Sequence, residues 1–441
     1  MRIDAGICFA LAFVLGATDA IGQVTQHVVA VPAGPWASAE IARLGDGAPD
    51  PAALDRFWRS VGAIGTPVVE RDPNDADSML ATFVVRAPGG PLSAVPAVHG
   101  TYGWHGLYPL RNLAGSDIWL ATIRFPSATR SAYWLAWPLG RSPHPEALDV
   151  FTVLADKAQP AQEVFADPLA PHAAPFFSIS TGKTGQYSWF EGPDAAAEPF
   201  LRLPPGSARG KLESRVAASA ILGNTRELTI YLPPGYAPQG SDAYPLVLMF
   251  DRDEYLTTVQ VPQLLDAMIG AGKVPPLIAV LVDVIDHDTR NRELPGDPKF
   301  QQFIREELLP QVESEFRIAR DPGRRVVAGV SYGGLCAMLL AMRYPESFGA
   351  VLSQSGAFWP DPTGTRAEVA RLVDDAPPTT MRVSLTVGLL ETDQMVGANR
   401  RLRDALIAKG HAVDYAEFMG AHDWIPWRAA FPRQLIALLG R

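Results

Sequence analysis

The pattern of hydrophobic and polar positions divides the chain into two parts. Between about residues 77 and 192, short apolar runs alternate with polar residues or threonine, and Pro, Gly, Asp and Ser separate the runs. Alternation with a period of two is typical of strands that bury one face, so this part predicts an antiparallel, all-β sandwich. Expected strands lie at residues 79–86, 117–125 and 132–137. One helix is expected before them, at residues 51–61, where a proline precedes apolar residues at helical spacing.

The pattern changes after residues 193–210, a segment rich in Pro, Ala and Gly that we interpret as a linker. Continuous apolar runs now alternate with helical stretches, as expected for parallel strands that are buried on both faces. Strands are predicted at residues 227–232, 245–250, 277–282, 325–330, 350–354, 383–387 and 414–418, and helices at 300–316, 335–343, 398–409 and 426–439. This alternation predicts an α/β domain with a mostly parallel sheet and helices on both faces.

The N-terminus has the layout of a secretory signal. Arg2 is followed by an apolar run over residues 5–15, which is too short to span a membrane, and by small residues up to Gly22. We therefore expect a signal peptide at residues 1–22, a sandwich domain at 23–192, the linker at 193–210 and the α/β domain at 211–441. Export to the periplasm is the expected location. Cleavage removes Cys8 and leaves Cys336 alone, so no intramolecular disulfide is expected.

Charge and motifs narrow the range of partners. The net charge of −9 and the pI near 5.4 argue against nucleic acid and anionic membranes as partners. No further segment is long and apolar enough for membrane insertion. The sequence contains no C-x-x-C pair, H-E-x-x-H pair or glycine-rich phosphate loop, so neither a metal nor a nucleotide cofactor is expected.

Residues 329–333, GVSYG, fit the G-x-S-x-G pattern with Ser331 at the centre. A predicted strand precedes them and a predicted helix follows, which is the context of a nucleophile elbow in the α/β-hydrolase fold. The elbow would present the Ser331 hydroxyl above a helix N-terminus, where positive partial charge stabilises an oxyanion. The expected oxyanion donors are the amide of Tyr332 and an amide near Asp251 and Arg252, after the strand at 245–250.

A serine nucleophile needs a base and an orienting acid, which follow it in the chain in this fold. His422 comes after the last predicted strand and is the expected base. His287 precedes Ser331, which is the wrong order, and His411 is expected to be a helix cap or surface residue. The acid should follow the strand at 383–387. Glu391 is preferred because it is nearer the strand end, while Asp393 and a dyad without an acid remain open.

With these residues in hand, the chain resembles the enterochelin (enterobactin) esterase family over most of its length. The similar segments include Phe57-Trp58, GTPVVE (65–70), DPL (167–169), LVDVID (281–286), RNRELP (290–295), VLSQSGAFW (351–359) and HDWIPWR (422–428). One departure is Arg252, since the family often has a glycine after the aspartate of the third strand.

The resemblance implies an immunoglobulin-like domain beside an esterase-D-like α/β-hydrolase that cleaves the trilactone esters of enterobactin or its glucosylated relatives. Ser331, His422 and Glu391 match the family's nucleophile, base and a glutamate of the same loop. Arg290 matches an arginine before the ELP motif, and Arg292 and Arg428 are further candidates for binding an anionic ferric catecholate. Two alternatives remain open: a general exported carboxylesterase or acyltransferase acting on feruloyl-type esters, and a catalytically silent siderophore-binding protein.

Overall fold

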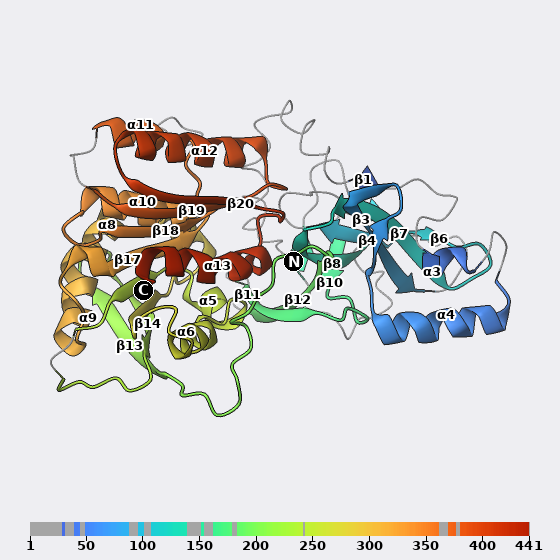
Figure 1. Ribbon diagram of the computed structural model, residues 1–441, viewed down its shortest axis with the longest axis horizontal. Helices are drawn as coiled ribbons and strands as arrows, with labels where there is room; N and C mark the ends of the chain where they lie inside the picture. The colour runs from blue at the N-terminus through green and yellow to red at the C-terminus, as the bar shows by residue number, and fades with distance from the viewer. Residues whose placement is uncertain are drawn as a thin grey trace, which may run out of the picture.

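The computed structural model describes residues 29–30, 39–44, 49–87, 96–100, 107–138, 151–153, 162–178, 183–240, 243–360, 369–375 and 380–440. The predicted signal peptide lies outside these residues. Two lobes lie side by side, the C-terminal α/β lobe and an N-terminal lobe of antiparallel sheets (Figure 1). Within the described residues, no helix combines the length and apolarity that a membrane crossing requires.

An eight-stranded sheet forms the centre of the C-terminal lobe. Its strands run in the order β13-β14-β16-β15-β17-β18-β19-β20. The first two pairings, β13 with β14 and β14 with β16, are antiparallel, and the other five are parallel. The strands are β13 (Lys211–Ser219), β14 (Asn224–Leu232), β15 (Leu246–Met249), β16 (Ile278–Val282), β17 (Arg325–Val330), β18 (Ala350–Gln354), β19 (Arg382–Gly388) and β20 (Ala412–Phe418).

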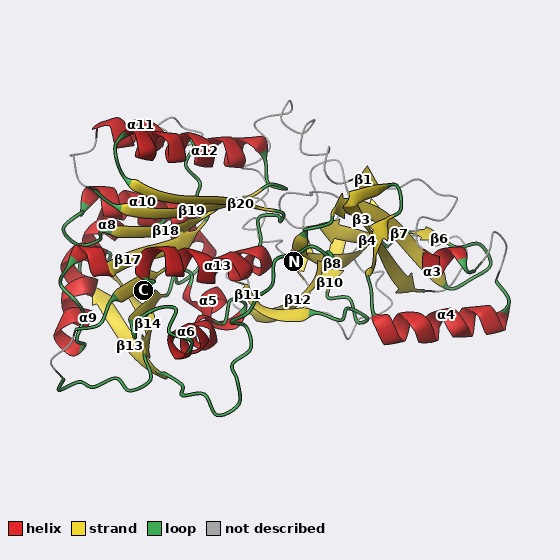
Figure 2. Ribbon diagram, viewed as in Figure 1, coloured by secondary structure: helices red, strands yellow, loops and turns green. Residues whose placement is uncertain are grey.

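Helices cover both faces of this sheet (Figure 2). One face packs on α8 (Pro298–Phe303), α9 (Leu309–Glu315), α10 (Tyr332–Arg343), α11 (Val369–Asp375) and α12 (Asp393–Ala408). The other face packs on α5 (Arg252–Thr257), α6 (Val261–Gly270) and α13 (Trp424–Leu439). A short helix, α7 (His287–Glu293), follows β16. The predicted α/β class is confirmed.

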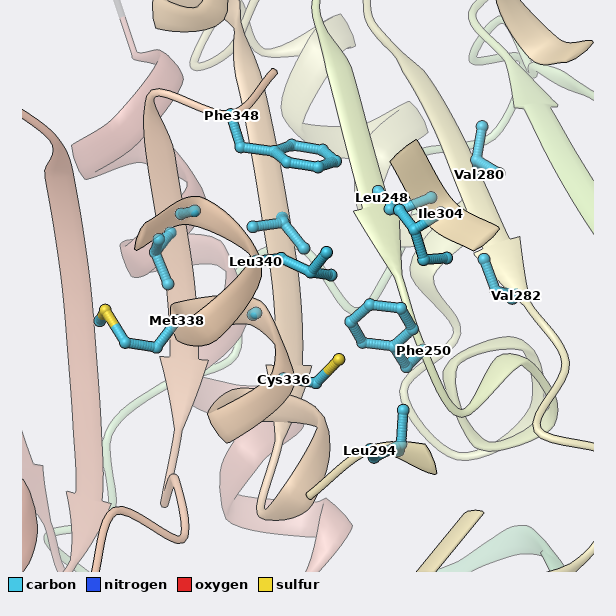
Figure 3. Packing of buried hydrophobic residues seen from close by; sticks show 14 of the residues in the cluster. Leu248, Phe250, Val280, Val282, Leu294, Ile304, Cys336, Met338, Leu340 and Phe348 are labelled. Atoms are coloured by element: carbon cyan, nitrogen blue, oxygen red, sulfur yellow. The ribbon is translucent and has the colours of Figure 1, made fainter. Parts of the chain in front are cut away.

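Side chains of single strands alternate between these two cores. Leu248 of β15 and Val280 of β16 belong to the α10 side, in the same buried cluster as Cys336 and Leu340 (Figure 3). Their chain neighbours, such as Met249, belong to the α13 side. Burial on both faces explains why these strands are continuous apolar runs in the sequence.

Two elements of this lobe differ from the sequence prediction. Strand β13 was not predicted, because it is an edge strand with charged and polar positions and has no apolar run. The predicted helix at 300–316 is interrupted by a π-helical turn, Ile304–Leu308, between α8 and α9. Pro310 follows this turn, and a proline ring excludes regular α-helical hydrogen bonding to the preceding turn.

The N-terminal lobe contains two antiparallel sheets. The first has the order β1-β7-β3-β2, with β6 beside β7, and the second has the order β11-β12-β8-β10-β9, with β4 and β5 beside β8. Phe83 of β3 and Tyr133 of β8 meet edge to face between the sheets. The strands are β1 (Val29–Ala30), β2 (Val68–Asp72), β3 (Asp75–Arg86), β4 (Ala97–Gly100), β5 (Leu107–Pro109), β6 (Arg111–Asn112), β7 (Ile118–Pro126), β8 (Arg130–Pro138), β9 (Phe151–Val153), β10 (Gln162–Phe165), β11 (Ala173–Ser178) and β12 (Lys183–Glu191).

This lobe contains helices as well as strands, so the all-β description is not confirmed. Helix α4 (Pro51–Ile64) buries Phe57 and Val61 against the first sheet, as its apolar spacing predicted, and a short helix α3 (Ala39–Ala42) packs nearby. Asp50 caps α4 by accepting a hydrogen bond from the Ala53 amide.

The predicted linker is anchored at both ends. Near its start, the Asp194 amide donates to the Ser127 carbonyl of the N-terminal lobe. Further along, Phe200 and Leu201 pack on the α13 side of the C-terminal lobe. At its end, the Gly210 amide donates to the Asp266 carboxylate, 2.7 Å away. The two lobes are therefore joined by a packed segment.

Candidate active site

Ser331 occupies a tight turn between β17 and α10. Its backbone has φ 54° and ψ −119°, a conformation that non-glycine residues rarely adopt and that occurs at functional sites. Gly329 allows the turn, because a Cβ at this position would lie 2.4 Å from the Gly333 carbonyl carbon. Backbone hydrogen bonds hold it, with the Ser331 amide donating to Gln354 and the Ser331 carbonyl accepting from Leu335. The turn has the strand-turn-helix form of a nucleophile elbow.

His422 and Glu391 form a close pair. His422 follows β20 and Glu391 follows β19, and these parallel strands are neighbours, so both loops leave the same edge of the sheet. The His422 Nδ1 atom lies 2.6 Å from Glu391 Oε2. Because an ionised carboxylate only accepts, Nδ1 carries the proton in this pair and Nε2 is left as the basic nitrogen.

Glu391 is buried, with 3% of its surface exposed, and both its oxygens have partners. Besides His422 on Oε2, its Oε1 accepts from the Gly388 amide at 2.8 Å and from the Ser355 hydroxyl at 2.5 Å. Asp393, the alternative acid, is exposed in the first turn of α12. Glu391 is thus the carboxylate that the structure pairs with His422.

Ser355 and Trp427 complete this pair, and neither was predicted to do so. The Trp427 indole donates to the Ser355 hydroxyl at 2.9 Å, and its ring meets the His422 ring edge to face with centroids 4.7 Å apart. Both residues lie in segments quoted for the family resemblance, but the sequence carries no signal for these contacts. They restrict the orientation of the carboxylate and of the imidazole.

The other two histidines of this lobe lie elsewhere. His287 begins α7, where its ring contacts Asn291. His411 is buried rather than on the surface, and its Nδ1 accepts from the Met381 amide at 3.1 Å. Burial, with a smaller contribution from Lys409, lowers the pKa of His411. His411 is therefore a neutral structural residue.

The predicted oxyanion segment has a specific support. Asp251, two residues after the end of β15, adopts a left-handed conformation with φ 58°, and its carboxylate is buried. Arg290 of α7 binds this carboxylate through two hydrogen bonds, 2.5 and 2.9 Å long. Arg252 is the first residue of α5, and its guanidinium pairs with Glu227 and Asp253. Tyr332, the other predicted donor, begins α10.

The three arginines that were predicted to bind substrate have different environments. Arg290 forms an ion pair with the buried carboxylate of Asp251. Arg428 is 2% exposed, forms a two-pronged ion pair with Glu198 and stacks over Trp189, so it connects α13 to the N-terminal lobe. Arg292 is the exposed one, with 60% of its side chain accessible, and lies 3.6 Å from Glu293. Of the three, only Arg292 offers a cation to solvent.

Among the described residues, no group of three or more His, Cys, Asp or Glu side chains could hold a metal ion. What the site contains is a serine on a strained elbow and a histidine paired with a buried glutamate, at one edge of one sheet. These parts suit acyl transfer through a serine nucleophile.

Comparisons with known proteins agree with this chemistry. Residues 219–438 match the family described as "Putative esterase". An iron(III) enterobactin esterase of Dickeya dadantii is 29% identical over 412 residues, which cover 86% of this chain and 91% of that protein. An iron(III) salmochelin esterase of Escherichia coli O6:H1 is 28% identical over 402 residues, covering 86% and 92%.

The resemblance extends to a solved structure. The crystal structure of a ferric enterobactin esterase from Salmonella typhimurium is 26% identical, with a TM-score of 0.71, and the match covers 87% of this chain and 98% of that one. Both lobes are therefore included in the likeness, and the chain is similar over most of its length to the enterobactin esterases.

Proposed function

We propose that this protein is a serine esterase that cleaves the trilactone ester bonds of a catecholate siderophore. The observation that carries the proposal is the pairing of His422 with buried Glu391, at the sheet edge where Ser331 occupies its elbow. The relatives named as iron(III) enterobactin and salmochelin esterases support the substrate class.

The proposed reaction has two steps. Ser331 Oγ attacks a lactone carbonyl while His422 Nε2 takes the hydroxyl proton, and the amides of Tyr332 and Arg252 donate to the oxyanion. When the tetrahedral intermediate collapses, the ester C–O bond breaks and His422 returns the proton to the departing seryl hydroxyl. A water molecule, deprotonated by His422, then hydrolyses the acyl-enzyme and restores Ser331. Glu391 stabilises the imidazolium throughout.

We further propose that the ferric complex is cleaved and that hydrolysis occurs in the periplasm after export. A ferric catecholate is an anion, and Arg292 supplies an exposed positive charge on α7. This helix follows β16, so it begins at the edge of the sheet where Ser331 lies. The signal-like N-terminus supports export.

The domain division is part of the proposal. We infer an immunoglobulin-like sandwich at residues 23–192 and an α/β-hydrolase domain at 211–441, joined by residues 193–210. The two antiparallel sheets with a shared core support the sandwich, although α4 is added to it.

The test is incubation of the purified protein with ferric and iron-free enterobactin, followed by chromatography of the products. We expect linear trimer or shorter units from the wild type and none from Ser331→Ala. Equal product from the variant would overturn the serine mechanism. Turnover of feruloyl esters alone would identify a general esterase, and binding without any turnover would identify a binding protein.

A further inference from the structure

The loop that carries His422 is built against the N-terminal lobe. We define the histidine loop as residues 419–425, between β20 and the first turn of α13. At its start, the Met419 carbonyl accepts a hydrogen bond from the Arg130 amide at the beginning of β8, 3.0 Å away. A Cβ on the next residue, Gly420, would lie 3.0 Å from the Arg130 carbonyl oxygen. Backbone of the two lobes is therefore in direct contact at this loop.

Asp423, next to the histidine, links the loop to β8 a second time. Its Oδ2 accepts from the Ser131 hydroxyl at 3.0 Å and from the Ala132 amide at 3.3 Å, and its Oδ1 accepts from the Ile425 amide at 3.0 Å. The side chains of Ser131 and Asp423 are buried, with 0% and 4% exposure. Charge-assisted hydrogen bonds shielded from water are among the stronger polar interactions of a protein.

Apolar contacts flank these hydrogen bonds. Ala421 belongs to the same buried cluster as Phe83 and Tyr133 of the N-terminal sheets, and so does Leu390, the residue before Glu391. Ile425 belongs to a second cluster, with Ala132, Ala174, Phe176 and Trp189 of the N-terminal lobe. The residues that adjoin both members of the acid–histidine pair are thus packed into the neighbouring lobe.

We propose that the N-terminal lobe is a working part of the catalytic centre, and that Ser131 and Asp423 are positioning residues for His422. The inference rests on the proposed function, in which His422 is the base. Contacts with the N-terminal lobe hold the histidine loop on both sides of residue 422, through Met419, Ala421, Asp423 and Ile425. These contacts keep the imidazole in the position where it pairs with Glu391. Because proton transfer requires atoms within hydrogen-bond reach, a small displacement of the loop lowers the rate of the chemical step.

The test is Ser131→Ala, which removes the hydroxyl donor to Asp423 and leaves the strand intact. With 4-nitrophenyl acetate as a small activated ester, we expect kcat to fall by about 10- to 100-fold. KM should change by less than about twofold, since only the proton-transfer geometry is altered. Asp423→Asn, which retains a cap for α13, should lower kcat as well. In the double variant, kcat should fall by less than the product of the two single fold reductions, because both substitutions remove the same contact.

Thr82→Val is the matched control. Thr82 is a buried hydroxyl of the N-terminal lobe, and its partner is Thr122, 3.0 Å away on the neighbouring strand of the first sheet. This variant should keep the wild-type kcat. A purely structural effect of Ser131→Ala would also lower the residual rate of a His422→Ala protein, whereas loss of positioning leaves that residual rate unchanged.

The outcomes separate the inference from the proposed function. A folded Ser131→Ala protein with wild-type kcat, or a loss matched by Thr82→Val, would overturn the positioning role. Should Ser131→Ala fail to fold, Asp423→Asn decides by the same criterion. If the wild type cleaves 4-nitrophenyl acetate through Ser331 but leaves enterobactin intact, the proposed substrate is wrong and the positioning role is still measured. Activity that survives Ser331→Ala overturns both.

Discussion

The two sides of the proposed catalytic centre are held by different parts of the chain. The serine side is supported within the α/β lobe: Gly329 permits the elbow, and the Arg290–Asp251 ion pair supports the neighbouring segment predicted to hold the oxyanion. The histidine side is supported by Ser355 and Trp427 from the same lobe, and by β8 from the other lobe. The proposed nucleophile, Ser331, is therefore positioned by local geometry, whereas the proposed base, His422, lies on a loop that is supported by both lobes.

This difference follows from the chemistry of each group. The position of a serine on an elbow is determined by the backbone of one turn between a strand and a helix. A histidine at the end of a loop has no such constraint and needs contacts with other segments. The comparison predicts that substitutions on the histidine side will lower kcat. Substitutions in the Arg290–Asp251 ion pair are expected to lower the free energy of unfolding as well.

The largest effect is expected from Glu391→Gln. An amide cannot replace the carboxylate as a pure acceptor for Nδ1–H, so the imidazole loses its tautomer and its orientation. We expect kcat on 4-nitrophenyl acetate to fall by about 10³- to 10⁴-fold. Asp393→Asn is the control, because Asp393 is exposed on α12, and it should retain nearly full activity. Equal losses in the two variants would contradict the assignment of the acid.

The next effect concerns the ion pair beneath the oxyanion segment. Arg290→Leu leaves Asp251 buried without a counter-charge, which should cost about 3–5 kcal/mol of unfolding free energy and lower activity in the surviving folded protein. The neighbouring Glu254 is itself an acid and cannot supply a positive counter-charge. Burial, followed by the charge of Asp251, raises its pKa well above its ordinary value. Urea unfolding followed by tryptophan fluorescence measures the loss.

Arg292→Leu is the matched control for this ion pair. Arg292 lies on the same helix but is exposed, so its replacement should change the unfolding free energy by less than about 0.5 kcal/mol. Under the proposed function, Arg292→Leu should raise the KM for ferric enterobactin and leave the KM and kcat for 4-nitrophenyl acetate unchanged. A stability loss as large as that of Arg290→Leu would contradict the distinction.

The smallest effect concerns pH and the second histidine. The pKa of His411 is lowered in the folded protein, so below about pH 6.5 the unfolded chain binds more protons there than the folded chain. This contribution to stability is complete above the pKa of the unfolded state and is lost as the pH falls. Urea unfolding at pH 7.5 and 5.5 should give a smaller pH difference for His411→Asn, whose amide oxygen can accept from Met381.

The catalytic rate serves as the control for that experiment. His411→Asn should have wild-type kcat at pH 7.5, because His411 contacts Met381 and lies outside the Glu391–His422 pair. A large rate loss would assign His411 to the catalytic centre.

Much of the α/β lobe was predictable because its strands are buried on both faces. The strand at 325–330 and the elbow after it were predicted at their observed positions, since hydrophobic runs and glycine spacing are local signals. The edge strand β13 was missed because its exposed positions remove that signal. The pairing of Arg428 with Glu198 was missed because the partners are 230 residues apart in the chain.

By itself, the sequence determined the order of the candidate catalytic residues along the chain. A serine lies between a strand and a helix, carboxylates follow a later strand, and a histidine follows the next strand. These features are local and depend on a few neighbouring residues. Only the tertiary structure decided that Glu391 rather than Asp393 pairs with His422, and that Arg290 forms an ion pair with Asp251. It also brought Ser131 to Asp423 across 292 residues. Such contacts depend on how sheets and lobes pack, and no local pattern of residues encodes them.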